Sequence, residues 1–199
     1  MRVNRNEYDN VRLDVERLKA GGHKCIIKQV LEGRSQTGKD MLTISYDTTE
    51  EDSQPKFFTE DYLGQSGTAK KWHGNHYIVR GNDYFLKNLK QFVGAAEASN
   101  EGFEGLDKDG TVKTDDFKGK KIGIVFREEE YLANTGRKGT SVKSFYFCNY
   151  ADAEDKPVPE KRTLPEQTRA FASPDPAAAS EGFMAVADNL EDVEGLPFA

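Results

Sequence analysis

Aromatic and basic side chains alternate in three stretches of this sequence: "KFFTEDY" (56–62), "AKKWHGNHYIVR" (69–80) and "RKGTSVKSFYF" (137–147). This combination suits unpaired nucleic acid, because flat rings stack on bases at about 1–3 kcal/mol per base while Lys and Arg neutralise phosphates. The candidate nucleic-acid-binding residues, from these stretches and from residues 24–39, are Lys24, Lys28, Arg34, Lys39, Lys56, Phe58, Lys70, Lys71, Trp72, His73, Tyr77, Arg80, Arg137, Lys138, Lys143 and Tyr146. The alternative is that Trp72 and Tyr77 anchor a long loop to the core and that the lysines are merely solvated.

A phosphate-binding loop is suggested by "GRSQTGKD", which has Gly33, Gly38 and Lys39 at the required spacing. The next position should be Ser or Thr to hold magnesium, but it is Asp40. A strand-like run follows at once, whereas a phosphate loop opens a helix. We therefore interpret the segment as a hairpin turn.

Metal and catalytic motifs are weaker still. "GLDKDGTVKTDD" resembles a calcium loop, but its first ligand position falls on Gly105, which has no side-chain oxygen. His73 and His76 offer two zinc ligands without a CxxC or an evident third ligand. No nucleophile–base pairing can be identified. We expect no metal, no cofactor and no enzymatic activity.

The net charge of −6 is concentrated at the C-terminus. Residues 166–199 contain seven acids and one base, and the remaining residues carry 27 charges of each sign. This asymmetry is typical of an acidic interaction tail. The last residues, "NLEDVEGLPFA", place carboxylates before a small apolar group, and the candidate partner-binding residues are Asp188, Glu191, Asp192, Glu194, Leu196, Pro197 and Phe198.

The composition favours one domain with appendages. Of 199 residues, 36% are apolar and 31% charged, enough for one modest core. No run approaches the roughly 18 apolar residues of a membrane span, so no membrane partner is expected. Only two cysteines, Cys25 and Cys148, are present, in apolar strand-like runs, which favours a reducing, cytoplasmic setting.

Strand-like patterns occupy residues 23–32, 41–47, 56–63, 77–80, 119–131 and 141–150. Helical spacing is clear only once, in the apolar series Phe85, Leu86, Leu89, Phe92, Val93 and Ala96. We interpret the pattern as about five strands, mostly in hairpin order, with one helix before the final pair.

The predicted fold class is mainly β with one helix: a five-stranded, OB-fold-like Greek-key barrel followed by a disordered acidic C-terminal tail. Another β-rich α+β domain is not excluded by the pattern. The predicted organisation is an N-terminal extension (1–20), an OB-fold-like domain that binds single-stranded DNA (21–153) and a flexible acidic protein-interaction tail (154–199), which is rich in Pro, Ala and charge.

Three segments, 17–30, 85–103 and 117–131, resemble in this order a family of bacteriophage single-stranded-DNA-binding proteins. The resemblance spans roughly residues 7–165. It implies an OB-type fold, a place in phage replication and recombination cassettes in the host cytoplasm, and work beside recombinases, helicases or polymerases.

The tail is similar to the acidic, Pro-Phe-ending tip of bacterial single-stranded-DNA-binding proteins, in which acids approach a basic groove and the Phe enters an apolar pocket. One departure is Ala199, which follows Phe198, so the free carboxylate is not on the Phe.

The sequence thus predicts a non-enzymatic protein that binds and protects single-stranded DNA with little sequence preference in phage replication or recombination. Its tail would recruit phage or host replication and recombination proteins, and a homo-oligomer is left open. The alternative is a protein-interaction adaptor, such as a recombinase loader or host-factor inhibitor, with little DNA affinity.

Overall fold

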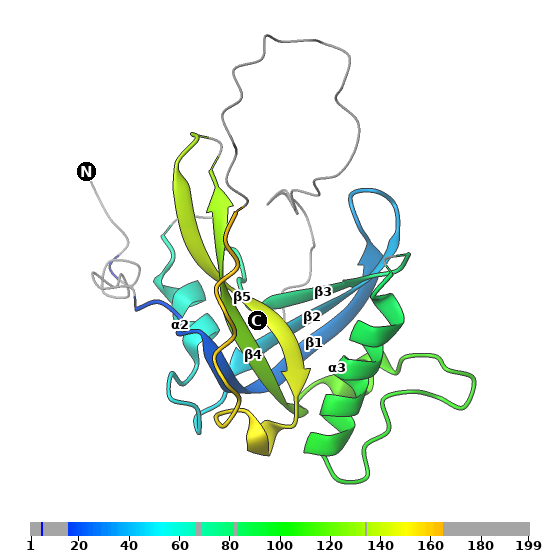
Figure 1. Cartoon of the computed structure of the whole chain (residues 1–199). Helices are drawn as coiled ribbons and strands as arrows, with labels where there is room; N and C mark the ends of the chain where they lie inside the picture. The colour runs from blue at the N-terminus through cyan, green and yellow to red at the C-terminus, as the bar shows by residue number, and fades with distance from the viewer. Residues whose placement is uncertain (1–4, 6–15, 67–68, 82, 134, 165–199) are drawn as a thin grey trace, which may run out of the picture. The chain divides into compact units, whose positions relative to one another are not determined.

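A five-stranded antiparallel sheet is the main element of the first compact unit, as seen in a computed structural model that describes residues 5, 16–66, 69–81, 83–133 and 135–164 (Figure 1). The strand order is β3-β2-β1-β4-β5. The strands are β1 (Gly21–Arg34), β2 (Asp40–Thr48), β3 (Asn75–Val79), β4 (Lys121–Leu132) and β5 (Lys138–Cys148). The prediction of a mainly β protein is confirmed.

Alternating burial along β1 and β2 explains why these segments form half-buried strands. Cys25, Ile27 and Val30 of β1 point into the core, and they meet Ile44 and Tyr46 of β2 there. The side chains between them are half-buried or exposed, since successive residues of a strand face opposite sides. A bulge between Ile27 and Gln29 shifts the register of the pair.

The predicted helix is confirmed as α3 (Phe85–Ser99), which lies between β3 and β4 in the chain. Its apolar face buries Phe92 and Val93. The Phe92 ring stacks on Phe117, in the 3-10 helix η1 (Thr114–Phe117), with 4.7 Å between centroids. Leu86, predicted to share this apolar face, is instead 74% exposed.

The strand predicted at residues 56–63 is wrong, because the structure has a second helix, α2 (Phe57–Gly64), in its place. Two side chains at the end of β2 supply acceptors for the first backbone N–H groups of this helix. Asp47 Oδ1 accepts from Phe58 N at 3.0 Å, and Thr48 Oγ1 accepts from Phe57 N at 2.8 Å. Between residues 16 and 164, the described part of the chain therefore has two α-helices where one was expected.

The outer strands of the sheet, β3 and β5, approach each other through side chains. His76 Nδ1 of β3 lies 2.8 Å from Ser144 Oγ of β5, and the His76 ring packs edge-on against Phe147. Burial lowers the pKa of His76 to about 4, so the ring is neutral near pH 7. Within the described residues no backbone ladder joins β3 to β5, so the sheet is not closed by hydrogen bonds between strands.

The residues after β5 return across the sheet. A 3-10 helix, η2 (Tyr150–Asp152), leads into residues 153–163, which we call the C-terminal strap. Glu130 N donates to Arg162 O at 2.8 Å, and Arg162 N donates to Glu128 O at 2.9 Å, so the strap pairs with β4. The first compact unit therefore runs to Thr163, past the boundary predicted at residue 153.

Two glycines make room for the strap. Ala153 is fully buried, and a Cβ built on Gly22 of β1 would lie 1.7 Å from the carbonyl oxygen of Ala153. A Cβ built on Gly123 of β4 would lie 3.0 Å from Ala153 Cβ, and 2.7 Å from both Cys148 Sγ and the carbonyl oxygen of Asn149. The sheet can hold the strap this closely only because both positions lack side chains.

We expect Gly22→Ala to lower the free energy of unfolding by about 1–3 kcal/mol, because the added methyl group overlaps the Ala153 carbonyl and the strap must move. Urea unfolding measures the change. Gly33→Ala on the same strand is the control, since a Cβ there meets nothing within 4 Å. Equal midpoints for the two variants would show that the strap does not need this close approach.

The other compact unit, Leu164–Ala199, lies almost entirely outside the described residues. The predicted tail and all of its candidate partner-binding residues fall there, as do most of residues 1–15 of the predicted N-terminal extension. Among the described residues, no helix has the length and apolarity needed to span a membrane.

Candidate nucleic-acid interface

Three predicted cations meet at the β1–β2 hairpin end. Arg34 and Lys39 are exposed at the turn, and Arg80 follows β3 beside it. Arg80 N donates to Asp40 O at 2.8 Å, and its guanidinium Nη1 lies 3.6 Å from Asp40 Oδ2. Lys39 lies beside Gly81. The structure thus groups Arg34, Lys39 and Arg80, which we call the hairpin cations.

The segment that resembles a phosphate loop is the hairpin turn that the sequence predicts. Ser35 N donates to Lys39 O at 2.8 Å and Gly38 N donates to Ser35 O at 2.8 Å, closing the turn. Gly38 has a φ of 75°, which glycine adopts readily. β2 begins at Asp40, so the helix that a phosphate loop requires is not formed here.

Trp72 lies against the core and fits the alternative in which it anchors its loop. Its ring centroid is 6.4 Å from that of Phe58 and 6.0 Å from that of Tyr62, and its Nε1 donates to Gly74 O at 3.1 Å. The exposed His73 beside it has Nδ1 2.7 Å from Asp61 Oδ2. Trp72 and His73 therefore attach this loop to α2 and to the core.

The neighbouring lysines are only partly available. Lys70 Nζ lies 5.7 Å from the centroid of the Tyr62 ring and donates to Leu63 O at 3.3 Å. Lys71 is exposed, and its backbone N–H donates to Gln65 Oε1. Lys56, which precedes α2, forms an ion pair with Glu50.

Phe58 is a predicted base-stacking residue that the structure removes from the interface. It is 5% exposed and packs against Tyr46 and Phe126 in the core. A ring enclosed in this way cannot stack on a base. The error follows from the incorrect strand prediction for residues 56–63, because successive residues of a strand face opposite sides and one of the two neighbouring Phe rings would then be on the outer face.

On β1, Lys24 is covered by the strap region. Lys24 Nζ is 3.0 Å from Glu154 Oε2 and 6.0 Å from the centroid of the Tyr150 ring, and only 20% of its side chain is exposed. Lys28 lies at the β1 bulge and is half-buried. The β1 lysines therefore do not join the hairpin cations in one open patch.

On the outer side of β3, Tyr77 is half-buried opposite Thr43 of β2, which in turn pairs with Leu31 of β1. Opposed residues of an antiparallel pair share a face. His76 of the same strand points inward to Ser144 and Phe147. Tyr77 is thus on the outer face, one residue away from the contact between β3 and β5.

A pocket of about 300 Å³ lies between α3 and β5, and we call it the β5–α3 pocket. Aromatic, basic and amide side chains share its walls. Its lining residues are Tyr84, Lys87, Asn88, Gln91, Phe145 and Tyr146. Of these, the sequence predicted only Tyr146.

Two of its rings are open to solvent: Tyr84 is 62% and Phe145 is 43% exposed. Phe145 is held in place from behind, because the Arg127 guanidinium carbon lies 4.0 Å from the centroid of its ring. Arg127 is itself paired with Glu129, and the Tyr146 ring meets Phe145 edge-on at 5.4 Å. The pocket therefore has a fixed aromatic wall with a cation behind it.

Further cations lie on the same hairpin. Lys143 of β5 is exposed and pairs in register with Arg127 of β4. Arg137 and Lys138 are exposed at the hairpin end. In Figure 1 the β4–β5 and β1–β2 hairpin ends both point to the top of the view.

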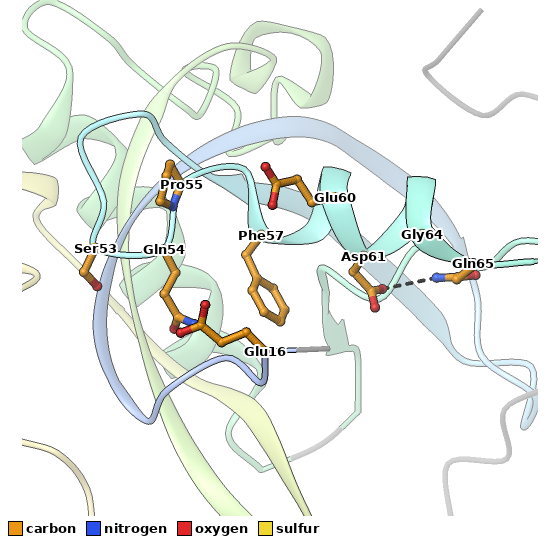
Figure 2. A pocket seen from close by; sticks show the side chains of 9 residues that line it. All are labelled: Glu16, Ser53, Gln54, Pro55, Phe57, Glu60, Asp61, Gly64 and Gln65. Carbon is orange, nitrogen blue, oxygen red and sulfur yellow. Dashed lines mark hydrogen bonds between the residues drawn. The ribbon is translucent and has the colours of Figure 1, made fainter. Parts of the chain in front are cut away.

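A second hollow, of about 240 Å³, is lined by acidic side chains, whereas the β5–α3 pocket is lined by rings and a lysine (Figure 2). It lies along α2, with the half-buried Phe57 ring between Glu16 and the helix, and Glu60 and Asp61 also line it. Asp61 Oδ2 accepts a hydrogen bond from Gln65 Nε2 at 3.1 Å. Three carboxylates would repel phosphates, so this side is unsuited to nucleic acid.

The residues of the two candidate metal motifs have other partners. His73 binds Asp61 and His76 binds Ser144, so the two histidines do not converge. In the acidic loop, Asp109 Oδ1 accepts from Thr111 N at 3.0 Å and Asp107 lies 3.6 Å from Lys113 Nζ. Within the described ranges, no three His, Cys, Asp or Glu side chains are grouped as metal ligands.

Comparison with protein-family models and with curated proteins gives no match, so the interpretation of this surface depends on its geometry and chemistry.

Proposed function

We propose that this protein binds and protects single-stranded DNA, without enzymatic activity and largely without sequence preference, in bacteriophage replication or recombination. The observation that carries the proposal is the β5–α3 pocket. It offers exposed rings beside Lys87, and unpaired bases and their phosphates need this pairing of ring and cation.

The strand arrangement supports an OB-type barrel as the scaffold. The order β3-β2-β1-β4-β5, with a helix between β3 and β4, matches a five-stranded, partly open Greek-key barrel. The His76–Ser144 hydrogen bond would complete its circumference where no backbone ladder does. In such folds, nucleic acid lies across the face of the second and third strands and is flanked by the β1–β2 and β4–β5 loops.

The positions of the exposed cations agree with this arrangement. Arg34 and Lys39 lie at the β1–β2 hairpin end with Arg80 beside them, and Arg137 and Lys138 lie at the β4–β5 hairpin end. A strand running between them would pass the outer face of β3, which carries Tyr77. The acidic residues 166–199 would then recruit replication or recombination proteins, as their resemblance to bacterial tips suggests.

The test is a fluorescence anisotropy titration of the full chain with labelled oligo-dT at several salt concentrations. For three to five neutralised phosphates, we expect the logarithm of the association constant to fall with log salt at a slope of roughly −2 to −3.5. A protein-interaction adaptor would give no titration at any salt concentration, and that result would overturn the proposal.

A further inference from the structure

The amide groups of Asn88 and Gln91 in the β5–α3 pocket are not needed for stacking or for neutralising phosphate. Both residues are half-buried on the side of α3 that lines the pocket. In the described part of the chain, neither side-chain amide makes a hydrogen bond to another residue. Each therefore keeps one acceptor and two donors for a ligand.

The two amides share the lining of the pocket with three aromatic rings and one lysine. Phe145 and Tyr146 come from β5, Tyr84 is the residue just before α3, and Lys87 lies one helical turn from Gln91. Its volume of about 300 Å³ is at the lower end of the range for small-ligand sites. Such a site would take one flat, polar-edged group between aromatic walls, with a cation for an attached phosphate.

We propose that the β5–α3 pocket takes a single nucleobase out of the bound strand and that Asn88 and Gln91 hydrogen-bond to its edge, favouring adenine. This inference rests on the proposed DNA-binding function. An amide presents its acceptor and donor side by side, and adenine N6 and N7 present the complementary donor and acceptor. The rest of the interface, which stacks and neutralises, has no such preference.

Phe145 is already fixed for this role. Arg127 lies against it at 4.0 Å and Glu129 holds Arg127, so the ring has little freedom left to lose when a base stacks on its open side. A base that enters beside Phe145 would have its edge directed toward α3, the element that carries both amides.

The experiment compares oligo-dT with the same oligonucleotide carrying one central dA or one central dC. We expect the wild-type chain to bind the dA oligonucleotide about 5- to 150-fold more tightly than oligo-dT, the range for one good bidentate base contact. The variant N88A/Q91A should lose this preference and keep its affinity for oligo-dT. Leu86 is exposed on the same helix and lies outside the pocket, so the variant Leu86→Ala should keep both the preference for dA and the affinity for oligo-dT.

The outcomes separate the inference from the function. Tight binding of oligo-dT with equal affinity for all three oligonucleotides would overturn base reading and leave the DNA-binding proposal standing. No binding to any of them would overturn both. If N88A/Q91A lowers the affinity for all three oligonucleotides equally, the amides shape the pocket and do not recognise a particular base, which overturns the inference. Urea unfolding verifies that the variant folds, and the single variants N88A and Q91A replace it if it does not.

Discussion

Replacing both Tyr84 and Phe145 by alanine should lower the affinity for oligo-dT by at least about 30-fold, because each ring contributes about 1–3 kcal/mol when a base stacks on it. Both side chains are open to solvent, so their removal should leave the core intact. The salt slope should stay unchanged, since no cation is removed. Fluorescence anisotropy across a salt series measures both quantities.

Tyr131→Ala is the matched control for that variant. Tyr131 is a similarly exposed aromatic, 48% accessible, on the β4–β5 hairpin, and it does not line the β5–α3 pocket. We expect it to bind oligo-dT nearly as the wild type does. An equal loss in the control would mean that bases stack along the hairpin rather than in the pocket, and unchanged binding in the double variant would exclude the pocket altogether.

Replacing Asp52 by alanine should lower the free energy of unfolding by about 1–3 kcal/mol for each buried donor that loses its acceptor. Asp52 Oδ1 lies 2.9 Å from His23 Nδ1, and both residues are buried. The carboxylate also accepts from Lys24 N at 2.7 Å and Gln54 N at 2.8 Å. Alanine would leave these polar groups without a partner in the interior.

The same carboxylate makes stability depend on pH. Burial alone raises the pKa of Asp52, but the hydrogen bond from His23 and those from the Gln54 and Lys24 backbone outweigh it and lower the pKa. A lowered pKa stabilises the fold above the unfolded-state value of about 4, and this stabilisation is lost as the pH falls through the folded-state value. The wild type should therefore lose stability below about pH 4 more steeply than Asp52→Ala.

Urea unfolding between pH 3 and pH 7 measures both effects. Asp40→Ala is the control, because the Asp40–Arg80 pair is exposed and should contribute less than about 1 kcal/mol. If Asp52→Ala unfolds at the same urea concentration as Asp40→Ala, the buried pair does not stabilise the fold.

The sheet and α3 could be predicted from the sequence because their apolar residues repeat with clear periods. In β1 the buried Cys25 and Ile27 alternate with outer residues, and in α3 Phe92 and Val93 lie at helical spacing. The helix α2 could not, because its eight residues are too few to show a period and its first N–H groups depend on Asp47, outside the segment.

The pocket was less accessible to prediction than the fold. The bulge between Val125 and Phe126 leaves Phe145 as an extra residue on β5, so alternation along that strand does not show which face carries its ring. Tyr84 precedes α3 and lies outside its apolar repeat. The one available signal was the cluster of aromatics at 145–147, which indicated rings without separating Phe145 at the surface from Phe147 in the core.

The glycine-lined contact between β1 and Ala153 has a consequence for biosynthesis. Gly22 is near the beginning of the first compact unit and Ala153 near its end, so most of that unit must leave the ribosome before the two can meet. In a nascent chain that ends after β4, Gly22 and Gly123 would stay exposed, because Ala153, which covers them, has not yet been synthesised. Such long-range closure slows folding and makes completion of the fold a late, cooperative step in the maturation of the protein.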